Sequence, residues 1–418
     1  MLKIIILLLL IISPSFAYLD PGTGSMLLYF IMGVIATFIY FIKGVYYKVK
    51  AFILGGKIDK GLRDLEGIDI LFYSEGGNYW NVFLPVIEAL ETMQIKSAYY
   101  TASTDDPGLE TSFQFLRSRF IGNDLSAFTL LNHIKVKVMV MTTPQLDIMH
   151  LKRSKYVNHY VHLIHAPTDA LIYKKFAFDY FDSVMCSGLH QIESIRLLEI
   201  KRNLPVKVLF KTGLTYYDVM SKNKEKYLKE KDKIVVLIAP TWGSNGMLEK
   251  FDITFIKVLL DEDYEVILRP HPQMYVSQKE LMTGIEKELK VYTNLTIDTN
   301  ISGEESMGKA DILISDVSGI IFDFMFVFEK PVVVIESKLE KGGLEAEDVE
   351  KEIWESMMIR KHTISVNHDS IISLPEIIRD TLVSENIIDM RKIRDESLFN
   401  FAIAGNVAAK QIIEIIGR

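Results

Sequence analysis

Short β-rich runs alternate with helical patterns from Ile68 to about residue 336, and this alternation constrains the fold more than any other feature of the sequence. The candidate strands of the first half are Ile68–Ser74, Lys135–Thr142, His159–His165, Asp182–Ser187 and Val206–Gly213. Helical patterns such as Asn81–Met93 and Leu189–Lys201 lie between several of them. This arrangement predicts a parallel sheet with helices on both faces.

A charged stretch, Ser221–Lys233, interrupts the alternation and is predicted to be an interdomain linker or an exposed helix. The alternation then begins again, with candidate strands at Lys233–Pro240, Tyr264–Pro270, Asp311–Ser315 and Pro331–Glu336. The last stretch, Asp389–Ile416, has helical periodicity and is expected to pack across the domain junction. We therefore predict an α/β fold with two Rossmann-like domains that face a cleft.

The chain is expected to have five parts. These are a signal-like apolar segment (1–17), a transmembrane anchor with its basic flank (18–50), an N-terminal Rossmann-like acceptor domain (51–222), a C-terminal Rossmann-like donor domain (223–385) and a C-terminal helix (386–418).

The first fifty residues resemble membrane-targeting sequence. The apolar run Ile4–Ile12 and the small residues that lead to Ala17 are typical of a signal peptide, and the sequence leaves cleavage after Ala17 open. A second uncharged run, Met26–Ile42, would span about 26 Å as a helix, close to the thickness of the hydrocarbon core. The alternative is a buried helix of a soluble protein.

Lysines follow the second apolar run at positions 43, 48, 50, 57 and 60, whereas the segment 18–25 before it contains no basic residue. The positive-inside rule therefore places the remainder of the chain in the cytoplasm, at the inner (cytoplasmic) membrane. The net charge of −7 gives no support to nucleic-acid binding. Cys186 is the single cysteine, which excludes an internal disulfide and makes a structural zinc site improbable.

The segment Ser315–Met325 directly follows a candidate strand and has the features of an anion site. Ser318 can cap the next helix, and Gly319 lets a diphosphate approach the backbone amides of the first turn. Asp323 lies one turn further on, where its carboxylate could accept hydrogen bonds from ribose hydroxyls. Asp316 is a candidate for donor binding and equally for an ordinary turn. The alternative for the whole segment is a capped helix with a solvated aspartate.

Two histidines follow strands in opposite halves of the chain. His271 lies between two prolines after the strand Tyr264–Pro270, where it could stabilise a phosphate with the help of Arg269. His165 ends a strand of the first half, and a neutral imidazole there is a natural base for an alcohol. Either histidine could instead be an ordinary polar residue.

Two glycine-containing loops complete the candidate site. Thr241, in the loop Ala239–Gly246, is a candidate for phosphate binding. Ser74, Glu75 and Gly76 follow the first strand and are candidates for acceptor binding. The acidic triplet Asp261-Glu262-Asp263 precedes a strand, at the wrong end of the sheet for a donor metal, and is predicted to be a solvated turn. The acidic stretch Glu345–Glu355 is expected to be an exposed helix.

Taken together and in this order, five segments resemble the CDP-glycerol glycerophosphotransferase family of teichoic-acid primases and polymerases. They are Ile164–Ala170, Lys211–Asp218, Ala239–Gly243, Arg269–Gln273 and Ser315–Phe324. The resemblance implies a GT-B fold without a catalytic metal or cofactor, with a CDP-glycerol or related CDP-polyol donor in the C-terminal half. It implies that His165 is the base and that His271 stabilises phosphate. Ser318, Gly319 and Asp323 would then lie in the nucleotide-diphosphate site.

The same resemblance implies a lipid-linked or polymeric acceptor of the cell envelope. The chain departs from the family pattern at Ile164-His165-Ala166, where the family often has Trp-His-Gly, and at Gly243, where it often has arginine. Fewer cations suggest a less phosphorylated substrate, so the polyol and the ability to polymerise stay open. A nucleotide-sugar glycosyltransferase or epimerase of the same fold is the alternative function, and a non-catalytic membrane scaffold is a further one.

The predicted topology can be tested by protease accessibility. In intact spheroplasts, residues beyond about 50 should be protected from external protease, because the basic flank retains them inside. Permeabilised spheroplasts are the control and should allow digestion. Cleavage of this region in intact spheroplasts would contradict the topology.

Overall fold

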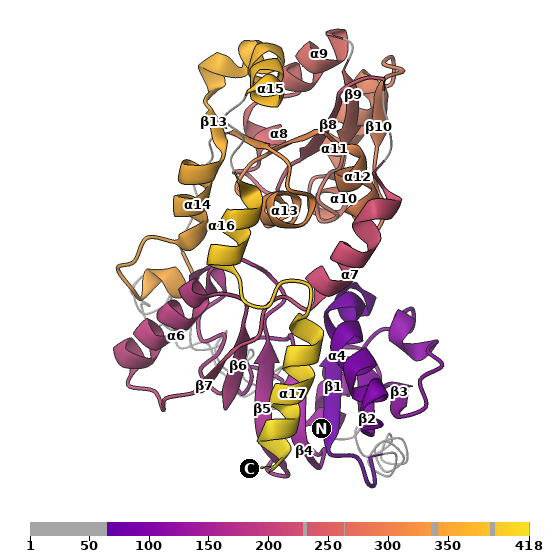
Figure 1. Ribbon diagram of the computed structural model, residues 1–418, viewed down its shortest axis with the longest axis vertical. Helices are drawn as coiled ribbons and strands as arrows, with labels where there is room; N and C mark the ends of the chain where they lie inside the picture. Colours follow the sequence, from indigo (N-terminus) through magenta and orange to yellow (C-terminus); the bar gives the residue numbers. More distant parts are fainter. Residues whose placement is uncertain (1–64, 229–231, 263, 336–341, 385–388, 418) are drawn as a thin grey trace, which may run out of the picture. The chain divides into compact units, whose positions relative to one another are not determined.

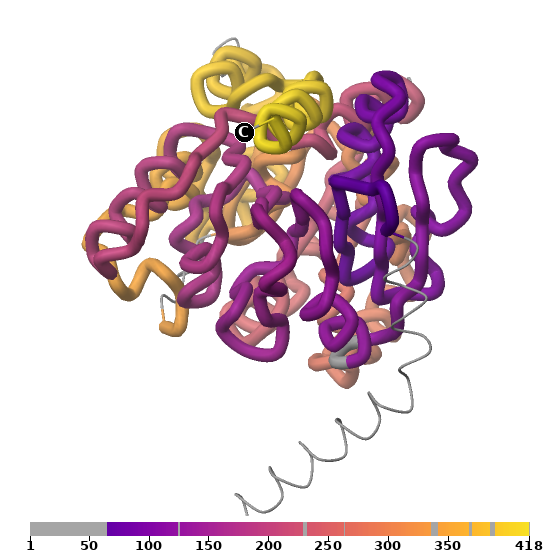
Figure 2. Tube along the Cα trace, turned by 90° about the horizontal axis from the view of Figure 1, so that it is seen from below, coloured from indigo at the N-terminus to yellow at the C-terminus, as the bar shows by residue number. Residues whose placement is uncertain are grey.

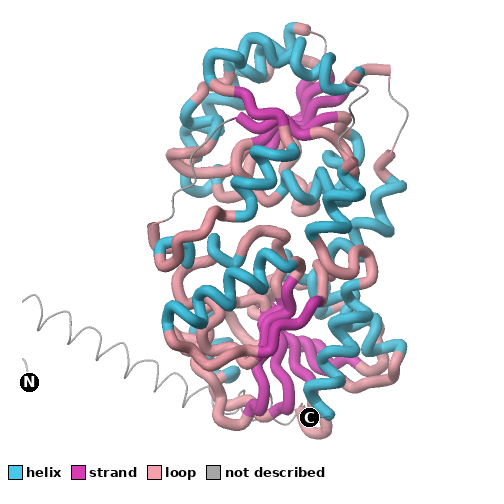
Figure 3. The backbone as a smooth tube through the Cα atoms, turned by 60° about the vertical axis from the view of Figure 1, so that its left-hand side comes forward, coloured by secondary structure: helices cyan, strands magenta, loops and turns pink. Residues whose placement is uncertain are grey.

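The computed structural model describes residues 65–228, 232–262, 264–335, 342–384 and 389–417. Within these residues the chain forms two separate parallel β-sheets, each flanked by helices (Figure 3). The predicted α/β class with two Rossmann-like sheets is confirmed. The predicted signal-like segment and transmembrane anchor, residues 1–50, lie outside the described residues. Among the described helices, we find none long and apolar enough to span a bilayer.

The first sheet has seven strands in the order β3-β2-β1-β4-β5-β6-β7. Its strands are β1 (Ile70–Ser74), β2 (Ser97–Thr101), β3 (Leu116–Phe120), β4 (Val136–Met141), β5 (Val157–Leu163), β6 (Ser183–Cys186) and β7 (Val208–Lys211). Each neighbouring pair is parallel, with register pairs such as Met141–His162 and Leu163–Met185. All carboxyl ends therefore lie at one edge of the sheet.

The second sheet has six parallel strands in the order β10-β9-β8-β11-β12-β13. Its strands are β8 (Val235–Ala239), β9 (Glu265–Leu268), β10 (Leu295–Ile297), β11 (Ile312–Ser315), β12 (Val332–Ile335) and β13 (Ile364–Val366). Strands β8, β11 and β12 consist almost wholly of buried aliphatic residues, because helices cover both faces of the sheet.

The α-helices connect the strands and cover the sheets (Figure 1). Their bounds are α4 (Trp80–Thr92), α5 (Asp124–Leu131), α6 (Leu189–Arg202), α7 (Tyr216–Asn223), α8 (Met247–Lys250), α9 (Thr254–Asp261), α10 (Met274–Ser277), α11 (Lys279–Leu289), α12 (Glu304–Lys309), α13 (Ile320–Asp323), α14 (Trp354–His362), α15 (Leu374–Val383), α16 (Met390–Ser397) and α17 (Ala404–Gly417). A π-helical turn, η5 (Phe324–Phe328), continues α13.

Four of the strands were not predicted from the sequence: β2, β3, β10 and β13. Three of them, β3, β10 and β13, are edge strands that carry partly exposed or polar residues. Strand β2 is buried, but its sequence Ser-Ala-Tyr-Tyr-Thr contains no aliphatic β-branched residue. These strands therefore lack the Val- and Ile-rich pattern that identified the central strands.

The end of the chain forms two helices rather than the single helix that was predicted: α16 contacts the turn η5 of the second half, and α17 returns to the first sheet. Helix α16 ends at Ser397, and Asn400 and Ala402 then adopt positive φ angles of 45° and 60°. The Asn400 side-chain amide donates to the carbonyls of Lys211 and Thr212, which fixes this turn. Helix α17, yellow in Figure 2, follows and packs against α4 and β4.

Two contacts hold α17 in place. The carboxylate of Asp218, in α7, accepts hydrogen bonds from the first amides of α17, Ala404 N at 3.0 Å and Gly405 N at 2.8 Å. A carboxylate is favourable here because the first amides of a helix have no partner within the helix. A Cβ atom at Gly405 would lie 2.4 Å from Cβ of Pro85 in α4. The two helices can therefore approach this closely only because residue 405 is glycine.

The acidic stretch Glu345–Glu355 is not the exposed helix that was predicted. Glu345 and Glu355 are buried, and only a short 3-10 turn, η6 (Glu345–Glu347), and the start of α14 are helical. Antiparallel backbone contacts join the beginning of this stretch to the first-sheet domain, including Glu345 N to Tyr173 O at 2.8 Å. Basic partners compensate the acidic charge, so the stretch can be buried.

Arg202, in α6, supplies most of that compensation. Its guanidinium forms ion pairs with Asp179 at 2.8 Å, Asp348 at 2.7 Å and Glu345, and its side chain is only 10% exposed. Lys175 pairs with Glu347 and Asp348, both at 2.9 Å. A segment that follows the second sheet's β12 in sequence is thereby fixed to the first-sheet domain.

The α4–α17 contact makes a prediction about stability. Gly405→Ala should destabilise the protein by about 1–3 kcal/mol, because the added methyl group must push Pro85 and its backbone aside. Gly417→Ala is the matched control, since its new methyl group meets nothing within 4 Å. Chemical denaturation of both variants measures the difference. Equal stabilities would show that the helices can separate at little cost.

Candidate functional site

The predicted base, His165, lies two residues beyond β5, at the edge where the strands of the first sheet end. Its ring contacts Tyr79 edge-on, with ring centroids 5.1 Å apart, and Tyr173 with centroids 6.3 Å apart. Burial lowers the pKa of His165 to about 4, so the ring is neutral at physiological pH. A neutral imidazole can accept a proton, as a base requires.

The Nδ1 atom of His165 is buried and has no hydrogen-bond partner among the described residues. Many catalytic histidines are oriented by a carboxylate or carbonyl at the nitrogen that does not react. Here the two tyrosine rings restrict the imidazole instead. His162, on the same strand, is fully buried among aromatic rings such as Phe178 and Phe181, and burial lowers its pKa to about 3. His162 is therefore a core residue.

The loop after His165 is tied to α14 by reciprocal hydrogen bonds. The Asp169 amide donates to Glu355 Oε1 at 2.8 Å, and the Trp354 amide donates to Asp169 Oδ2 at 3.2 Å. The Trp354 indole stacks on His190 at 4.1 Å, and His190 Nε2 is 2.8 Å from the Pro167 carbonyl oxygen. The first turn of α14 therefore determines where the His165 loop lies.

On the donor side, Asp316 holds the loop that contains Thr241. Its carboxylate is completely buried and accepts hydrogen bonds from Thr241 N at 2.7 Å and from Met247 N at 2.8 Å. The side chain is thus used by the protein itself. Asp316 shapes the 241–247 loop, and the direct donor contact predicted for it is not supported by this geometry.

Ser318 does not cap the helix, contrary to the prediction. Helix α13 begins at Ile320, its N-cap residue is Gly319, and no side chain caps it. Ser318 instead contributes its backbone carbonyl, which accepts from Ile321 N at 3.3 Å. A Cβ atom built on Gly319 would meet nothing within 4 Å. Open space therefore adjoins the backbone at the position where the sequence predicts a diphosphate.

Asp323 lies in a partly buried environment between two tyrosines of α7. Its Oδ1 atom accepts hydrogen bonds from Tyr216 at 2.6 Å and Tyr217 at 3.0 Å. Burial raises the pKa of Asp323 to about 6, although the two hydroxyls counteract the shift. The predicted one-turn spacing from Gly319 is present, but the carboxylate already joins α13 to α7.

His271 and Arg269 point to different partners. His271 is exposed, accepts a hydrogen bond at Nδ1 from Gln273 N at 3.1 Å, and lies 6.1 Å from the Trp242 ring. Arg269 instead forms an ion pair with Asp298 at 2.7 Å and donates to the Ile301 carbonyl. The structure thus brings His271 to the 241–247 loop, whereas the guanidinium of Arg269 is engaged by Asp298.

The predicted acceptor residues after β1 differ in accessibility. Ser74 is completely buried, and its hydroxyl donates to the Gly76 carbonyl at 2.8 Å. Glu75 is exposed. Burial of Tyr79, reinforced by the charge of Glu75, raises the pKa of the Tyr79 hydroxyl. Ser74 therefore stabilises the turn, whereas Glu75 and Gly76 remain at the surface near the rings that pack on His165.

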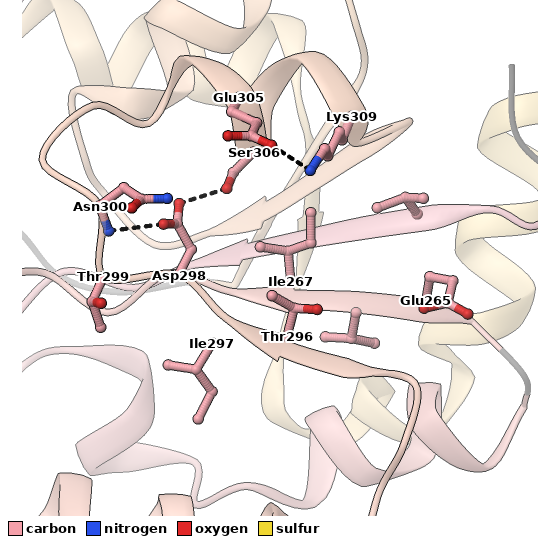
Figure 4. A pocket seen from close by; sticks show the side chains of 12 residues that line it. Glu265, Ile267, Thr296, Ile297, Asp298, Thr299, Asn300, Glu305, Ser306 and Lys309 are labelled. Atoms are coloured by element: carbon pink, nitrogen blue, oxygen red, sulfur yellow. Dashed lines mark hydrogen bonds and ion pairs between the residues drawn. The ribbon is translucent and has the colours of Figure 1, made fainter. Parts of the chain in front are cut away.

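A groove of about 510 Å³ lies between strands β9 and β10 and helix α12 (Figure 4). Its polar residues include Asp298, whose carboxylate accepts from Ser306, Asn300 N and Arg269. Glu305 and Lys309 form an ion pair one turn apart along α12. None of the predicted site residues lines this groove.

Sequence reasoning missed Tyr173, Tyr216, Tyr217 and Glu355, which surround the predicted residues. Tyr216 and Tyr217 lie in the segment Lys211–Asp218, which is one of the segments that carry the family resemblance, so the sequence could have indicated them as site residues. Glu355 gave no such signal, because an acidic run is usually solvated. Of the acidic triplet predicted to be a solvated turn, Asp261 ends α9 and Glu262 follows it, and both side chains are exposed.

The two parallel sheets, with candidate residues at strand ends, define a two-Rossmann-domain protein of GT-B type. Residues 194–344 match the family described as CDP-Glycerol:Poly(glycerophosphate) glycerophosphotransferase. A teichoic acid glycerol-phosphate transferase of Staphylococcus aureus (strain NCTC 8325 / PS 47) is 30% identical over 120 residues, which cover 27% of this chain and 28% of that protein. These matches cover part of the chain, residues 194–344 for the family model, and they confirm the predicted resemblance to the CDP-glycerol glycerophosphotransferase family.

Solved structures show the same fold. The wall teichoic acid polymerase TagF, as a histidine-to-asparagine variant with CDPG, superposes with a TM-score of 0.56 and 16% identity, over 88% of this chain and 97% of that chain. The UDP-GlcNAc 2-epimerase of Methanocaldococcus jannaschii, with UDP-GlcNAc and UDP, has a TM-score of 0.55 and 14% identity, over 83% and 99% of the respective chains. At such identities the likeness extends to the fold alone.

The buried Glu355 carboxyl makes a prediction about pH and stability. Burial, reinforced by the charge of Asp169, raises the pKa of Glu355 from 4.5 to about 8. The folded state therefore holds this proton more tightly than the unfolded state, and stability is lost as pH rises from about 4.5 through about 8. Glu355→Gln keeps an oxygen for the Asp169 amide but cannot ionise. When the pH is raised from about 5 to about 8.5, the melting temperature of Glu355→Gln should therefore decrease less than that of the wild type.

Parallel thermal melts in one buffer series, with Glu352→Gln as control, measure the effect. Glu352 is largely exposed and pairs with Arg360 at the surface, so its substitution should leave the wild-type pH slope unchanged. Identical slopes for wild type and Glu355→Gln would contradict the raised pKa.

Proposed function

We propose that this chain transfers a glycerol-phosphate-like group from a CDP-linked polyol to a lipid-linked or polymeric acceptor of the cell envelope. The observation that carries the proposal is the neutral His165 beyond the end of β5, in a chain whose candidate donor loops fall inside the matched family region. Those loops contain Thr241, His271 and Ser318–Asp323. The S. aureus relative, a glycerol-phosphate transferase by name, supports the same chemistry.

The donor would lie against the open space beside Gly319, with its diphosphate near the backbone amides that begin α13. Both tyrosine bonds to Asp323 engage Oδ1, so its second oxygen could accept a ribose hydroxyl. His271, beside Trp242 and the 241–247 loop, would donate to a phosphate oxygen. Thr241 would contribute from the loop that Asp316 fixes.

Transfer would occur by in-line attack of an acceptor hydroxyl on the β-phosphorus of the donor. A bond forms between the acceptor oxygen and that phosphorus, the bond to the bridging oxygen of CMP breaks, and CMP leaves with the electron pair. His165 takes the proton of the hydroxyl. His271 and backbone amides would stabilise charge that develops on the leaving CMP.

Membrane association through Met26–Ile42 and a cytoplasmic active site belong to this proposal, since lipid-linked acceptors and CDP donors would then meet at the inner face. A UDP-sugar epimerase or glycosyltransferase is the second candidate. The fold favours neither, because the epimerase and TagF superpose equally well. The family match favours the glycerophosphotransferase.

Two substitutions should separate chemistry from donor binding in the full-length protein. His165→Ala should reduce turnover of CDP-glycerol by roughly 10²–10⁴-fold while CDP still binds, because it removes only the base. Gly319→Val should abolish CDP binding, because its side chain fills the open space where the diphosphate must approach. Isothermal titration with CDP and with UDP measures binding, and CMP release measures turnover.

Gly284→Val is the matched control for Gly319→Val, since Gly284 also borders open space but is exposed on α11. It should bind CDP like the wild type. Normal CDP affinity in Gly319→Val would place the donor elsewhere, and a preference for UDP would favour the second candidate. Near-normal turnover in His165→Ala would remove the base from the mechanism.

A further inference from the structure

Several buried polar atoms around His165 have no hydrogen-bond partner among the described residues, and three of them carry the argument. They are Nδ1 of His165, the hydroxyl oxygen of Tyr173 and Oε2 of Glu355. Glu355 is only 2% exposed. Buried polar groups of folded proteins almost always have a partner, and the exceptions require an explanation.

These atoms come from different elements but lie together. The rings of His165 and Tyr173 are 6.3 Å apart, and Tyr173 immediately follows the turn η3 (Ala170–Ile172). Glu355 reaches the same loop, because its other oxygen accepts the Asp169 amide at 2.8 Å. The charge of Glu355 also contributes to the raised pKa of Tyr173, as expected if the carboxyl and the hydroxyl are near each other.

Two further hydroxyls extend the set along the sheet edge. Thr143 and Ser187 follow β4 and β6, the strands on either side of β5, and their buried hydroxyl oxygens also lack partners among the described residues. Extending the register pair Leu163–Met185 by two residues places Ser187 next to His165. Neighbouring strands are about 4.8 Å apart, so these hydroxyls lie within reach of one small molecule.

The chemistry of this set matches a neutral polyol better than a phosphate. It contains three hydroxyls, a neutral imidazole and a carboxyl, which together donate to and accept from alcohol groups. None of the five side chains is a cation. Lys351, whose charge acts on Glu355, is already held by the His190 carbonyl, Ser194 and Glu193. A phosphate would find no positive partner among these groups.

We propose that Tyr173, Glu355, Thr143 and Ser187 form, around His165, a binding pocket for a neutral polyol: the hydroxyl-bearing end of the acceptor. This inference rests on the proposed function, which it deepens by assigning the acceptor subsite and its ligand class. The attacking hydroxyl is placed at the imidazole, and neighbouring hydroxyls of the same unit bind the tyrosine and the carboxyl. Phosphates of the acceptor stay outside the pocket.

The test uses the full-length protein in detergent with saturating CDP, and free glycerol as the probe. Saturation-transfer NMR should detect glycerol bound to the wild type, with inorganic phosphate and glycerol 3-phosphate as comparison probes. Tyr173→Phe removes one hydroxyl and keeps the ring that packs on His165, so glycerol affinity should fall roughly three- to tenfold. Glu355→Gln, which keeps the bond to Asp169, should weaken glycerol similarly.

Tyr264→Phe is the matched control, because it loses a hydroxyl that bonds only the Pro375 carbonyl in the second-sheet domain. It should bind glycerol like the wild type. CDP affinity should be unchanged in all three variants, which distinguishes the pocket from the donor site. In turnover assays, Tyr173→Phe should raise KM for the acceptor and leave KM for the donor unchanged.

The proposal would be overturned in favour of an anion site if inorganic phosphate or glycerol 3-phosphate bound more strongly than glycerol and if Tyr173→Phe and Glu355→Gln weakened that anion binding. Equal glycerol affinity in Tyr173→Phe, Glu355→Gln and wild type would also overturn it, since the unpartnered atoms would then bind only water. If glycerol binds as expected but the protein neither binds CDP nor releases CMP, the proposed function fails while the polyol pocket stands.

Discussion

The reciprocal hydrogen bonds between Asp169 and the start of α14 are the interaction on which the candidate site depends. The backbone amide of Asp169 donates a hydrogen bond to the Glu355 carboxyl, and the Asp169 carboxylate accepts one from the backbone amide of Trp354. Both side chains are buried, so breaking either bond would leave a polar group in a poorly solvated place. His165 lies only four residues before Asp169, and its position therefore follows from a helix of the second half of the chain.

The same segment explains why a division of the sequence into two halves describes the protein incompletely. Residues 343–355 follow β12 of the second sheet, yet their acidic side chains pair with Arg202 and Lys175 of the first-sheet domain. The chain returns once more at α17, which Asp218 caps and Gly405 allows to approach α4. Residues 343–355 and α17 thus both connect the two halves of the chain through buried polar contacts, which require good geometry to be stable.

The central strands could be predicted because their aliphatic runs reflect burial on both faces, and the strand-end position of His165 and His271 followed from them. The partners of the site residues could not be predicted in the same way. Ser318 and Asp323 fit a helix-end anion site by type and spacing, but the cap is absent and two tyrosines hold the aspartate. Glu355 is separated from Asp169 by 185 intervening positions, and only tertiary packing brings them together.

A histidine whose pKa burial lowers to about 4 is a weak base, and this bears on what His165 can do. In phosphoryl transfer the transition state is largely dissociative, with little bond formation to the attacking oxygen. The acceptor hydroxyl then becomes acidic only late, when its bond to phosphorus is nearly complete, and even a weak neutral base can accept the proton at that stage. What the site must provide early is position, and the rings of Tyr79 and Tyr173 and the loop held by α14 supply it. The absence of an orienting carboxylate at Nδ1 among the described residues is consistent with such a role, because a stronger base would gain little in rate.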